Sequence, residues 1–475
     1  MIWETVIGLE THVQLSTNTK LFSRASTTFG ASPNTNVNLV DCGLPGVLPS
    51  INKEAFYKAI RFGMAIGAQI NQTSIFDRKN YFYADLPKGY QITQMDLPIV
   101  LGGSIEITSN DLVKTINITR AHLEEDAGKS IHDEYDGFSA IDLNRAGTPL
   151  LEIVSEPEIS SAKEAVAYMK AMHQLVTYLD VSDGNMAQGS LRCDANVSIR
   201  KKGDKELGTR TEIKNINSFK FIEKAINYEV KRQIKILENG EKVTQETRLY
   251  DSAKDETRPM RSKEFANDYR YFPEPDLLPV VISDEEMQAI KDEFPELPKE
   301  KEKRYTQEFE LSAYDAQIIV SSKSMADFFE TASKKTQNYL LLSNWLIGDI
   351  SAFLNKEAIE IHESKLSPDN VAMLINRIDD QTISGKIGKS IFEEMCISGS
   401  SPDEIIELQG LKQISDDGEI EAIIESIISA NPSQVESFKN GKEKLFGFFV
   451  GQVMKETQGK ANPKVVNEIL KRKLS

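Results

Sequence analysis

RAHLEEDAGKSIHDEYDGFSAIDLNRAGTPLLEIVSEPE, residues 120–158, is the stretch around which the rest of the chain is organised. It is dense in side chains that can bind or transfer charge: His122, Glu124, Glu125, Asp126, Asp142, Asn144, Arg145, Glu152 and Glu156. Mg²⁺ takes oxygen ligands and is usually held by one or two carboxylates together with substrate phosphates. The stretch therefore favours a hard cation and a phosphorylated ligand, although a solvated acidic turn is the better interpretation of any single glutamate in it.

Length and composition limit the class of protein. A chain of 475 residues exceeds one ordinary core, so two to four domains are expected. A hydrophobic content of 40%, a charged content of 27% and a net charge of −16 indicate a globular protein without a uniformly basic surface, while leaving room for a local basic patch. Three widely separated cysteines favour neither a disulfide framework nor a zinc site and fit a reducing, cytoplasmic compartment. The first fifteen residues do not resemble a signal peptide, and no run approaches the roughly 20 apolar residues of a membrane span.

Three segments with alternating polarity predict strands that carry functional groups on one face. Residues 1–15 place Glu10 and His12 on the same face, because side chains alternate along a strand. These two are metal ligands, an acid–base pair or a surface pair, with about equal weight. The other two segments, 184–203 and 209–219, carry rows that suit hydrogen bonds to phosphate and carboxylate: Arg192, Asp194, Asn196, Glu212, Lys214 and Asn215.

The remaining patterns predict an α+β chain that ends in helices. Residues 76–96 combine aromatic side chains with Lys79 and Lys88, which is typical of a core edge or of a ligand cleft. Beyond about residue 283 the strand patterns give way to short helices, two of which begin with Ser-Pro. The last block, 409–475, has an acidic first half and a basic end. Because its charge is sorted, we expect the basic end to bind a nucleic-acid backbone rather than to be a solvated helix pair.

Known nucleotide and hydrolase motifs are missing from the sequence. It has no G-x-x-x-x-G-K-[ST], G-x-G-x-x-G, H-E-x-x-H or G-x-S-x-G segment. What remains is a carboxylate-rich site with Arg, Lys and Asn, which suits phosphoryl transfer assisted by Mg²⁺. Nucleotide-dependent activation is the favoured interpretation, a Mg²⁺-dependent hydrolase comes second, and a non-catalytic scaffold third.

Several long segments resemble one known family. They are ETVIGLETHVQL, FDRKNYFYADLPKGYQITQ, HLEEDAGK, DLNRAGTPLLEIVSEPEI, GSLRCDANVSIR, EIKNINSFKFIEKAI, DYRYFPEPDLLP and GFFVGQVMKETQGKANPKVVNEIL. Together they resemble the B subunits of bacterial tRNA-dependent amidotransferases, over essentially the whole chain. The resemblance implies a cradle of antiparallel sheets with helices over residues 1–292, a helical domain over 293–408 and a tRNA-binding helical tail over 409–475.

The resemblance also implies an activity and partners. With ATP and Mg²⁺, such a subunit phosphorylates the side-chain carboxylate of Glu-tRNA(Gln), or of Asp-tRNA(Asn). Ammonia from a glutaminase A subunit then reaches it through a channel, and a small C subunit wraps the A–B interface. The alternative is a tRNA-binding scaffold whose chemistry lies wholly in its partner.

Roles for individual residues follow from the same resemblance. The implied catalytic residues are Glu125, Glu124, Arg192 and Asp194, and the implied metal ligands are Glu10, His12, Glu125 and Glu152. ATP or the aminoacyl end would be held by Asn144, Arg145, Asn196, Glu212, Lys214 and Asn215, and the ammonia route lined by Lys79, Lys88 and Thr148. Some members of the family bind zinc through two cysteine pairs in the early loop. The matching positions here are Ser23, Ala25, Asn38 and Asp41, so no zinc is expected.

Overall fold

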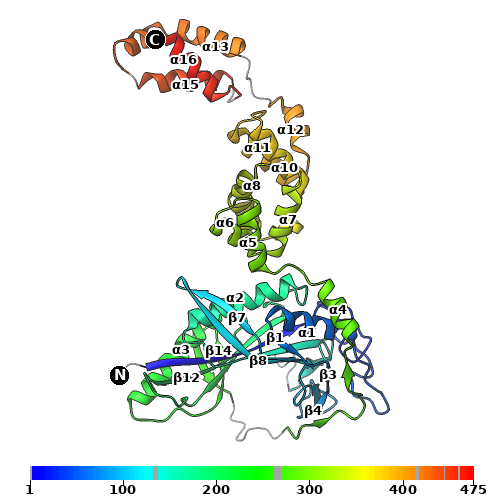
Figure 1. Cartoon of the computed structure of the whole chain (residues 1–475). Helices are drawn as coiled ribbons and strands as arrows, with labels where there is room; N and C mark the ends of the chain where they lie inside the picture. Colours follow the sequence, from blue (N-terminus) through cyan, green and yellow to red (C-terminus); the bar gives the residue numbers. More distant parts are fainter. Residues whose placement is uncertain are drawn as a thin grey trace. The chain divides into compact units, whose positions relative to one another are not determined.

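The computed structural model describes residues 3–131, 137–260, 269–411, 417–442, 444–457 and 460–474. The chain divides into two compact units, residues 1–298 and 299–475 (Figure 1). The first is rich in sheet with helices, and the second is helical, which confirms the α+β class. No helix in the described part of the chain has both the length and the apolar character that crossing a membrane requires.

One large sheet dominates the first unit. In its described part, ten strands form this sheet in the order β15-β14-β13-β12-β1-β11-β8-β6-β2, with β7 paired to β8. Neighbouring strands run antiparallel except β13 and β14, which are parallel. The strands are β1 (Trp3–Gln14), β2 (Gln69–Ile70), β6 (Val100–Leu101), β7 (Ser104–Ser109), β8 (Leu112–Glu125), β11 (Pro149–Ser155), β12 (Leu191–Lys201), β13 (Thr211–Lys214), β14 (Thr247–Asp251) and β15 (Glu256–Pro259).

Among the residues that the structure describes, short sheets and four helices complete the first unit. The short sheets are β9 (Lys129–Ile131) with β10 (Ala140–Asp142), β3 (Thr73–Ser74) with β17 (Val280–Val281), and β4 (Asp77–Asn80) between β5 (Tyr90–Thr93) and β16 (Phe272–Pro273). The helices are α1 (Lys53–Ala65), α2 (Ala162–Tyr178), α3 (Phe219–Glu238) and α4 (Asp284–Asp292). Each begins after an Asn or Ser whose side chain accepts a backbone N–H of the first turn, which satisfies a donor that the helix itself leaves unpaired.

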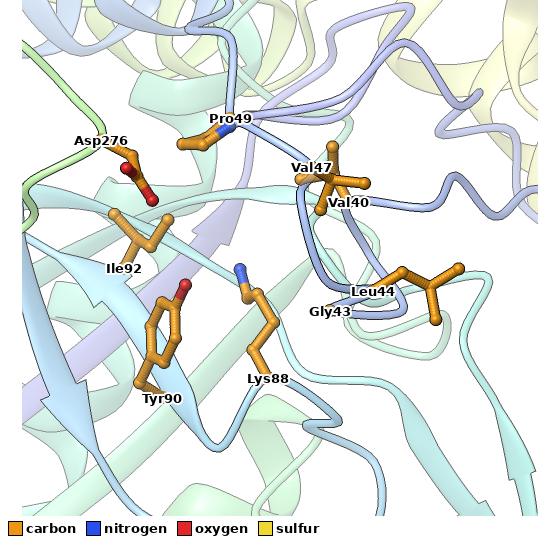
Figure 2. Close-up of a pocket in the computed structure, with 9 residues that line it drawn as sticks. All are labelled: Val40, Gly43, Leu44, Val47, Pro49, Lys88, Tyr90, Ile92 and Asp276. Carbon is orange, nitrogen blue, oxygen red and sulfur yellow. The ribbon is translucent and has the colours of Figure 1, made fainter.

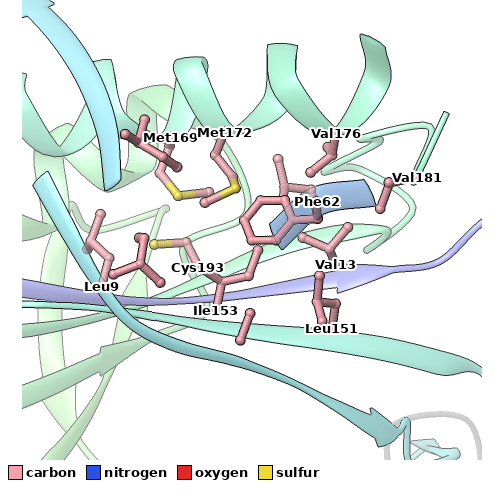
Figure 3. Close-up of a cluster of buried hydrophobic side chains, with 14 of the residues drawn as sticks. Leu9, Val13, Phe62, Leu151, Ile153, Met169, Met172, Val176, Val181 and Cys193 are labelled. Carbon is pink, nitrogen blue, oxygen red and sulfur yellow. The ribbon is translucent and has the colours of Figure 1, made fainter. Parts of the chain in front are cut away.

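Helix α2 covers one face of the central strands. Met169, Met172 and Val176 of α2 lie over alternate residues of β1, β11 and β12, as Figure 3 shows. Those strand residues are Leu9, Val13, Leu151, Ile153 and Cys193, and all are nearly or fully buried. Burying a side chain of this size stabilises the fold by about 1.5–3 kcal/mol. Because strand side chains alternate, the residues between them point away from α2, and these carry the polar groups.

A buried ion-pair network joins α3 to the far edge of the large sheet. Glu229 on α3 is fully buried and accepts hydrogen bonds from Arg232 at 2.9 and 2.7 Å, from Gln233 at 2.9 Å and from Thr257 at 3.0 Å. Burial opposes ionisation of this carboxyl, but the hydrogen bonds from Arg232 and Gln233 outweigh burial and lower its pKa.

Glu229→Gln should destabilise the protein by about 2–4 kcal/mol, because it removes the buried carboxylate that pairs with the part-buried Arg232 guanidinium. The lowered pKa means that the stabilisation by Glu229 is complete above its unfolded pKa of about 4.3 and is lost as the pH falls through the folded value. Urea unfolding at several pH values would therefore show the wild-type and variant curves converging below pH ~4. A stability difference that persists unchanged into acid would contradict this.

The second unit consists of short helices. In its described part they are α5 (Pro298–Glu308), α6 (Ala313–Val320), α7 (Lys323–Ser333), α8 (Tyr339–Trp345), η1 (Leu346–Ile350), α9 (Ser351–Glu357), η2 (Ile361–Glu363), α10 (Pro368–Asp379), α11 (Gly385–Ser398), α12 (Pro402–Gln409), α13 (Asp417–Ala430), α14 (Pro432–Lys439), α15 (Leu445–Glu456) and α16 (Pro463–Leu474). Ser367 and Ser401 cap α10 and α12 ahead of a proline, as the Ser-Pro pairs predict. The helices α13–α16 pack around an apolar core of their own. The finer division at residues 292 and 408 stays a prediction.

Candidate functional site

The face of the large sheet away from α2 carries a row of polar side chains across five adjacent strands. The pairing register places His12 of β1 opposite Glu152 of β11 and opposite Arg192 of β12. Likewise, Glu152 pairs with His122 of β8, and Glu10 pairs with Asp194. These residues are far apart in sequence, and strand pairing alone brings them together.

His12, Glu124 and Glu152 form the first group, whose ligand atoms all lie within 4.8 Å of one another. His12 Nε2 lies 3.8 Å from Glu124 Oε1 and 3.6 Å from Glu152 Oε2. His122 Nε2 lies 3.5 Å from the same Glu152 oxygen, and its Nδ1 is buried without a hydrogen-bond partner among the described residues. Two carboxylates beside an imidazole are a suitable donor set for a divalent cation such as Mg²⁺.

The charges in the first group depend on one another. Burial lowers the pKa of His12, but Glu152 and Glu124 outweigh burial and raise the pKa to about 9. Burial lowers the pKa of His122 to about 4, so this second histidine is neutral near pH 7. Burial, and then repulsion from Glu152, raise the pKa of Glu124. A cation bound between these carboxylates would relieve that repulsion.

Glu10, Asp194 and Glu212 form a second group, again with ligand atoms within 4.8 Å. Lys214 Nζ lies 2.6 Å from Asp194 Oδ2 and 2.9 Å from Glu212 Oε1. Asn196 donates a hydrogen bond of 2.8 Å to Glu10. Burial and the charge of Glu152 raise the pKa of Glu10, so the two groups are electrostatically linked. The second group is suited to a cation or to the charged end of a ligand.

The structure does not bring the four expected metal ligands, Glu10, His12, Glu125 and Glu152, into one group. Glu10 belongs to the second group, whereas His12 and Glu152 belong to the first. The Glu125 carboxylate is in neither, because it pairs with Lys88 and accepts the Ile92 N–H at 2.9 Å. Glu124 takes the expected place of Glu125, since adjacent residues of β8 leave the strand on opposite sides.

Four other expected site residues lie outside both groups. Arg145 donates to the carbonyls of residues 127 and 128, and Asn144 donates to those of residues 31 and 32. Asn215 donates to the Tyr250 carbonyl, and Thr148 is buried with its own carbonyl accepting the Asp126 N–H. The polar side chains of Arg145, Asn144 and Asn215 therefore hold loops in the structure as described.

The two expected channel lysines lie in different surroundings. Lys88 lines a cavity of about 90 Å³ together with Tyr90 and Asp276 (Figure 2), and its amine pairs with Glu125. The apolar part of that lining comes from Val40, Leu44, Val47, Pro49 and Ile92. Lys79 Nζ lies 5.0 Å from the centre of the Tyr269 ring. Burial opposes its charge, but Glu124, Tyr271, Glu152 and Tyr269 together outweigh burial and raise the pKa of Lys79.

Two models of known families match the chain. Residues 5–288, which contain both carboxylate groups, match the model described as the GatB/GatE catalytic domain, and residues 327–474 match the GatB domain. The chain belongs to the GatB family. It is 59% identical over 476 residues to a protein of Thioalkalivibrio sulfidiphilus, and 58% identical over 479 residues to one of Ectopseudomonas mendocina. Both matches cover 100% of each chain, and each relative is named as the B subunit of an aspartyl/glutamyl-tRNA(Asn/Gln) amidotransferase. The resemblance inferred from the sequence motifs is thereby confirmed.

Three residues of this GatB-family chain lie beside the two carboxylate groups but received no individual role from the sequence: His122, Asp126 and Gln14. The first two lie in the acidic stretch, where their neighbours Glu124 and Glu125 received the roles instead. Gln14 follows Glu10 and His12 at the same spacing of two, so it shares their face of β1. The alternation that identified Glu10 and His12 also points to Gln14.

A buried ion pair between Lys20 and Asp41 holds the early loop. Lys20 Nζ lies 2.9 Å from Asp41 Oδ2, and the two side chains are 0% and 3% exposed. Lys20 also donates to the Leu143 carbonyl at 3.1 Å, and the Asn38 N–H donates to Asp41 at 2.8 Å. The Asp41 carboxylate is thus engaged by a lysine and a backbone amide.

Lys20→Met should loosen the loop at residues 22–50, because it leaves a buried carboxylate uncompensated at a cost of about 3–5 kcal/mol. Hydrogen exchange and limited proteolysis of this loop would measure the effect. The control is Lys53→Met, since the pair of Lys53 with Glu286 is more exposed and contributes little to stability. A chelator should leave the wild-type loop unchanged, and opening on chelation would instead reveal a metal.

Proposed function

We propose that this chain is the subunit that activates the amino-acid carboxylate in a tRNA-dependent amidotransferase. Its reaction is ATP-dependent phosphorylation of the side-chain carboxylate of Glu-tRNA(Gln), of Asp-tRNA(Asn), or of both. Amidation by ammonia then yields Gln-tRNA(Gln) or Asn-tRNA(Asn). The observation that carries the proposal is the pair of adjoining carboxylate groups on one sheet face, inside the segment that matches the family's catalytic domain.

The residues fit divalent cations together with a polyphosphate. His12, Glu124 and Glu152 would hold one Mg²⁺, and Glu10, Asp194 and Glu212 are the candidates for a second. Mg²⁺ would offset the charge of the ATP phosphates and of the transferred group. Arg192 and Lys214, next to these groups, supply positive charge for phosphate and for the substrate carboxylate, and Asn196 orients Glu10.

The chemistry requires activation because a carboxylate is a poor acyl donor. Its charge repels a nucleophile, and oxide is a bad leaving group. One carboxylate oxygen attacks the γ-phosphorus of ATP, the bond to the bridging oxygen breaks, and ADP leaves. Ammonia then adds to the carbonyl of the acyl phosphate, the bond from that carbonyl carbon to the phosphate oxygen breaks, and inorganic phosphate departs as HPO4²⁻ with the proton that the nitrogen loses. Exclusion of water when the substrates bind would protect the acyl phosphate from hydrolysis.

The partners follow from the same proposal. A glutaminase A subunit would release ammonia, a small C subunit would wrap the A–B interface, and the charged tRNA would bind partly through the helical unit. Ammonia would arrive along a protected route lined by Lys79, Lys88 and Thr148, because free ammonia is protonated in water. Lys88 lines a cavity of about 90 Å³, which supports a place for it along such a route.

Trapping the acyl phosphate tests the proposal. The assembled enzyme, given Glu-tRNA(Gln), ATP and Mg²⁺ but neither glutamine nor ammonia, should convert added hydroxylamine into a γ-glutamyl hydroxamate with release of phosphate. Substitution of Glu124 by Gln should abolish the hydroxamate while glutaminase activity persists. Hydroxamate formation that survives this substitution would favour the scaffold alternative, with the chemistry in a partner.

A further inference from the structure

Asp126 lies at the edge of the proposed phosphoryl-transfer site but belongs to neither carboxylate group. It follows the last residue of β8, and its side chain is 4% exposed. Its Oδ2 accepts hydrogen bonds of 2.9 Å from Gln14 and of 2.9 Å from Arg192. Its Oδ1 accepts the Ala127 N–H at 3.0 Å. Both oxygens are therefore engaged by protein donors, which makes Asp126 unsuited to binding a metal directly.

The surroundings of Asp126 hold its carboxylate in one place. Its backbone N–H donates to the Thr148 carbonyl at 2.8 Å, and its own carbonyl accepts the Gly147 N–H at 2.8 Å. Arg145 Nε lies 3.6 Å from Oδ2, and the Arg145 guanidinium is itself held by two backbone carbonyls. The Asp126 carboxylate is thus held in one position between β1, β8 and β12.

Arg192 is the group that this fixed carboxylate orients. It lies on β12 directly opposite His12 of the first group, and its side chain is 31% exposed, so a ligand can reach it. One Nη2 hydrogen is taken by Asp126, and its Nε has no partner among the described residues. A guanidinium carries five N–H donors in one plane, so a single strong bond to Asp126 sets the direction of the others. Those others are available for phosphate oxygens beside His12.

We propose that Asp126 is a positioning residue that fixes the Arg192 guanidinium so that its remaining N–H groups bind the transferred phosphoryl group. This inference rests on the proposed function. Arg binds phosphate through paired, directional hydrogen bonds. Tilting the guanidinium plane therefore weakens phosphate binding more than a similar displacement of an undirected charge would. Asp126 acts through Arg192 and does not touch the substrate.

The test is a double-mutant cycle in the assembled enzyme with Asp126→Asn, Arg192→Lys and the double variant. Each single substitution should lower the rate of hydroxamate formation at saturating ATP by about 10- to 100-fold, the range expected for an orienting partner. The double variant should be no worse than Arg192→Lys alone, because both remove the same interaction. The Mg²⁺ concentration for half-maximal rate should stay within twofold of wild type.

Glu229→Gln is the control for lost stability. Glu229 is also a buried carboxylate bound to an arginine, but it lies at α3, and this variant should keep the wild-type rate of phosphorylation. A rate for Asp126→Asn within twofold of wild type, multiplicative effects in the double variant, or a shifted Mg²⁺ requirement would each overturn the inference.

Binding of a non-hydrolysable ATP analogue separates this inference from the proposed function. If the wild-type enzyme forms no hydroxamate, the function fails. Calorimetry with the analogue still tests the role of Asp126. If Asp126 and Arg192 are coupled, their substitutions weaken analogue binding non-additively across the two single variants and the double variant. Additive effects, or none, would overturn the positioning role even where the hydroxamate forms.

Discussion

Glu152→Gln in the assembled enzyme should reduce ATP-dependent formation of the acyl phosphate by about 100-fold or more. Glu152 is central to the first group, since one of its oxygens lies 3.6 Å from His12 and 3.5 Å from His122. Gln keeps the shape of the side chain but removes the charge that a divalent cation requires. Metal ions contribute several kcal/mol of charge stabilisation in such reactions, and each 1.4 kcal/mol is a factor of ten. Hydroxamate formation as a function of Mg²⁺ concentration would measure the loss.

Glu125→Gln is the matched control for Glu152→Gln, because Glu125 is a buried carboxylate of the same sheet that pairs with Lys88 instead of lining a group. It should lower hydroxamate formation less than tenfold. Glutaminase activity should persist in both variants, which shows that the complex assembles. If Glu125→Gln abolishes the acyl phosphate and Glu152→Gln does not, the assignment of the first group is wrong.

Removal of residues 409–475 should weaken tRNA binding by about 10- to 100-fold and flatten its dependence on salt. Each bound phosphate contributes slightly less than one unit to the slope of log affinity against log salt concentration, so the slope should fall by about one for each phosphate that the shortened protein no longer binds. The helices α13–α16 have their own apolar core, so the truncation removes a packed body and leaves helices α5–α11 whole. Filter binding at several salt concentrations would measure both changes.

The structure distinguishes a basic residue of this tail that is paired with carboxylates from basic residues that are exposed. Lys473 lies 2.5 Å from Glu421 and 2.7 Å from Glu425, so its charge is balanced within the tail. Lys442 and Lys444 are exposed. We expect Lys442→Gln with Lys444→Gln to flatten the salt slope, and Lys473→Gln to leave it nearly unchanged. An unchanged slope on removal of the whole tail would exclude it from phosphate binding.

The early loop, which has Cys42 as its single cysteine, shows how far a resemblance reaches. The sequence predicts that Ser23, Ala25, Asn38 and Asp41 do not form a zinc site, and it leaves the loop to packing and hydrogen bonds. It does not identify Lys20 as the partner of Asp41, because 21 residues of irregular chain separate them. A buried lysine is unusual in any sequence, and the fold alone shows that this one is matched by a carboxylate.

Local periodicity determined much of the fold and part of the candidate site. Alternation along a strand is a property of the backbone, so the sequence placed Glu10 with His12, and Arg192 with Asp194 and Asn196, on shared faces. The sequence also predicted the capped helices after Ser367 and Ser401, and the change from strands to helices beyond about residue 283. These features depend on residues a few positions apart.

Tertiary structure decided what depends on distant pairing. The register between β1, β8 and β11 brought Glu124 rather than Glu125 to His12 and Glu152, and the pairing of β12 with β13 separated Glu10 into a second group. The path of the chain after β8 brought Asp126 to Arg192, and packing of α13 with α16 neutralised Lys473. The composition of the acidic stretch at 120–158 indicated a charged site. Which of its carboxylates face one another was set by strand register, because a shift of one residue turns every side chain to the other face.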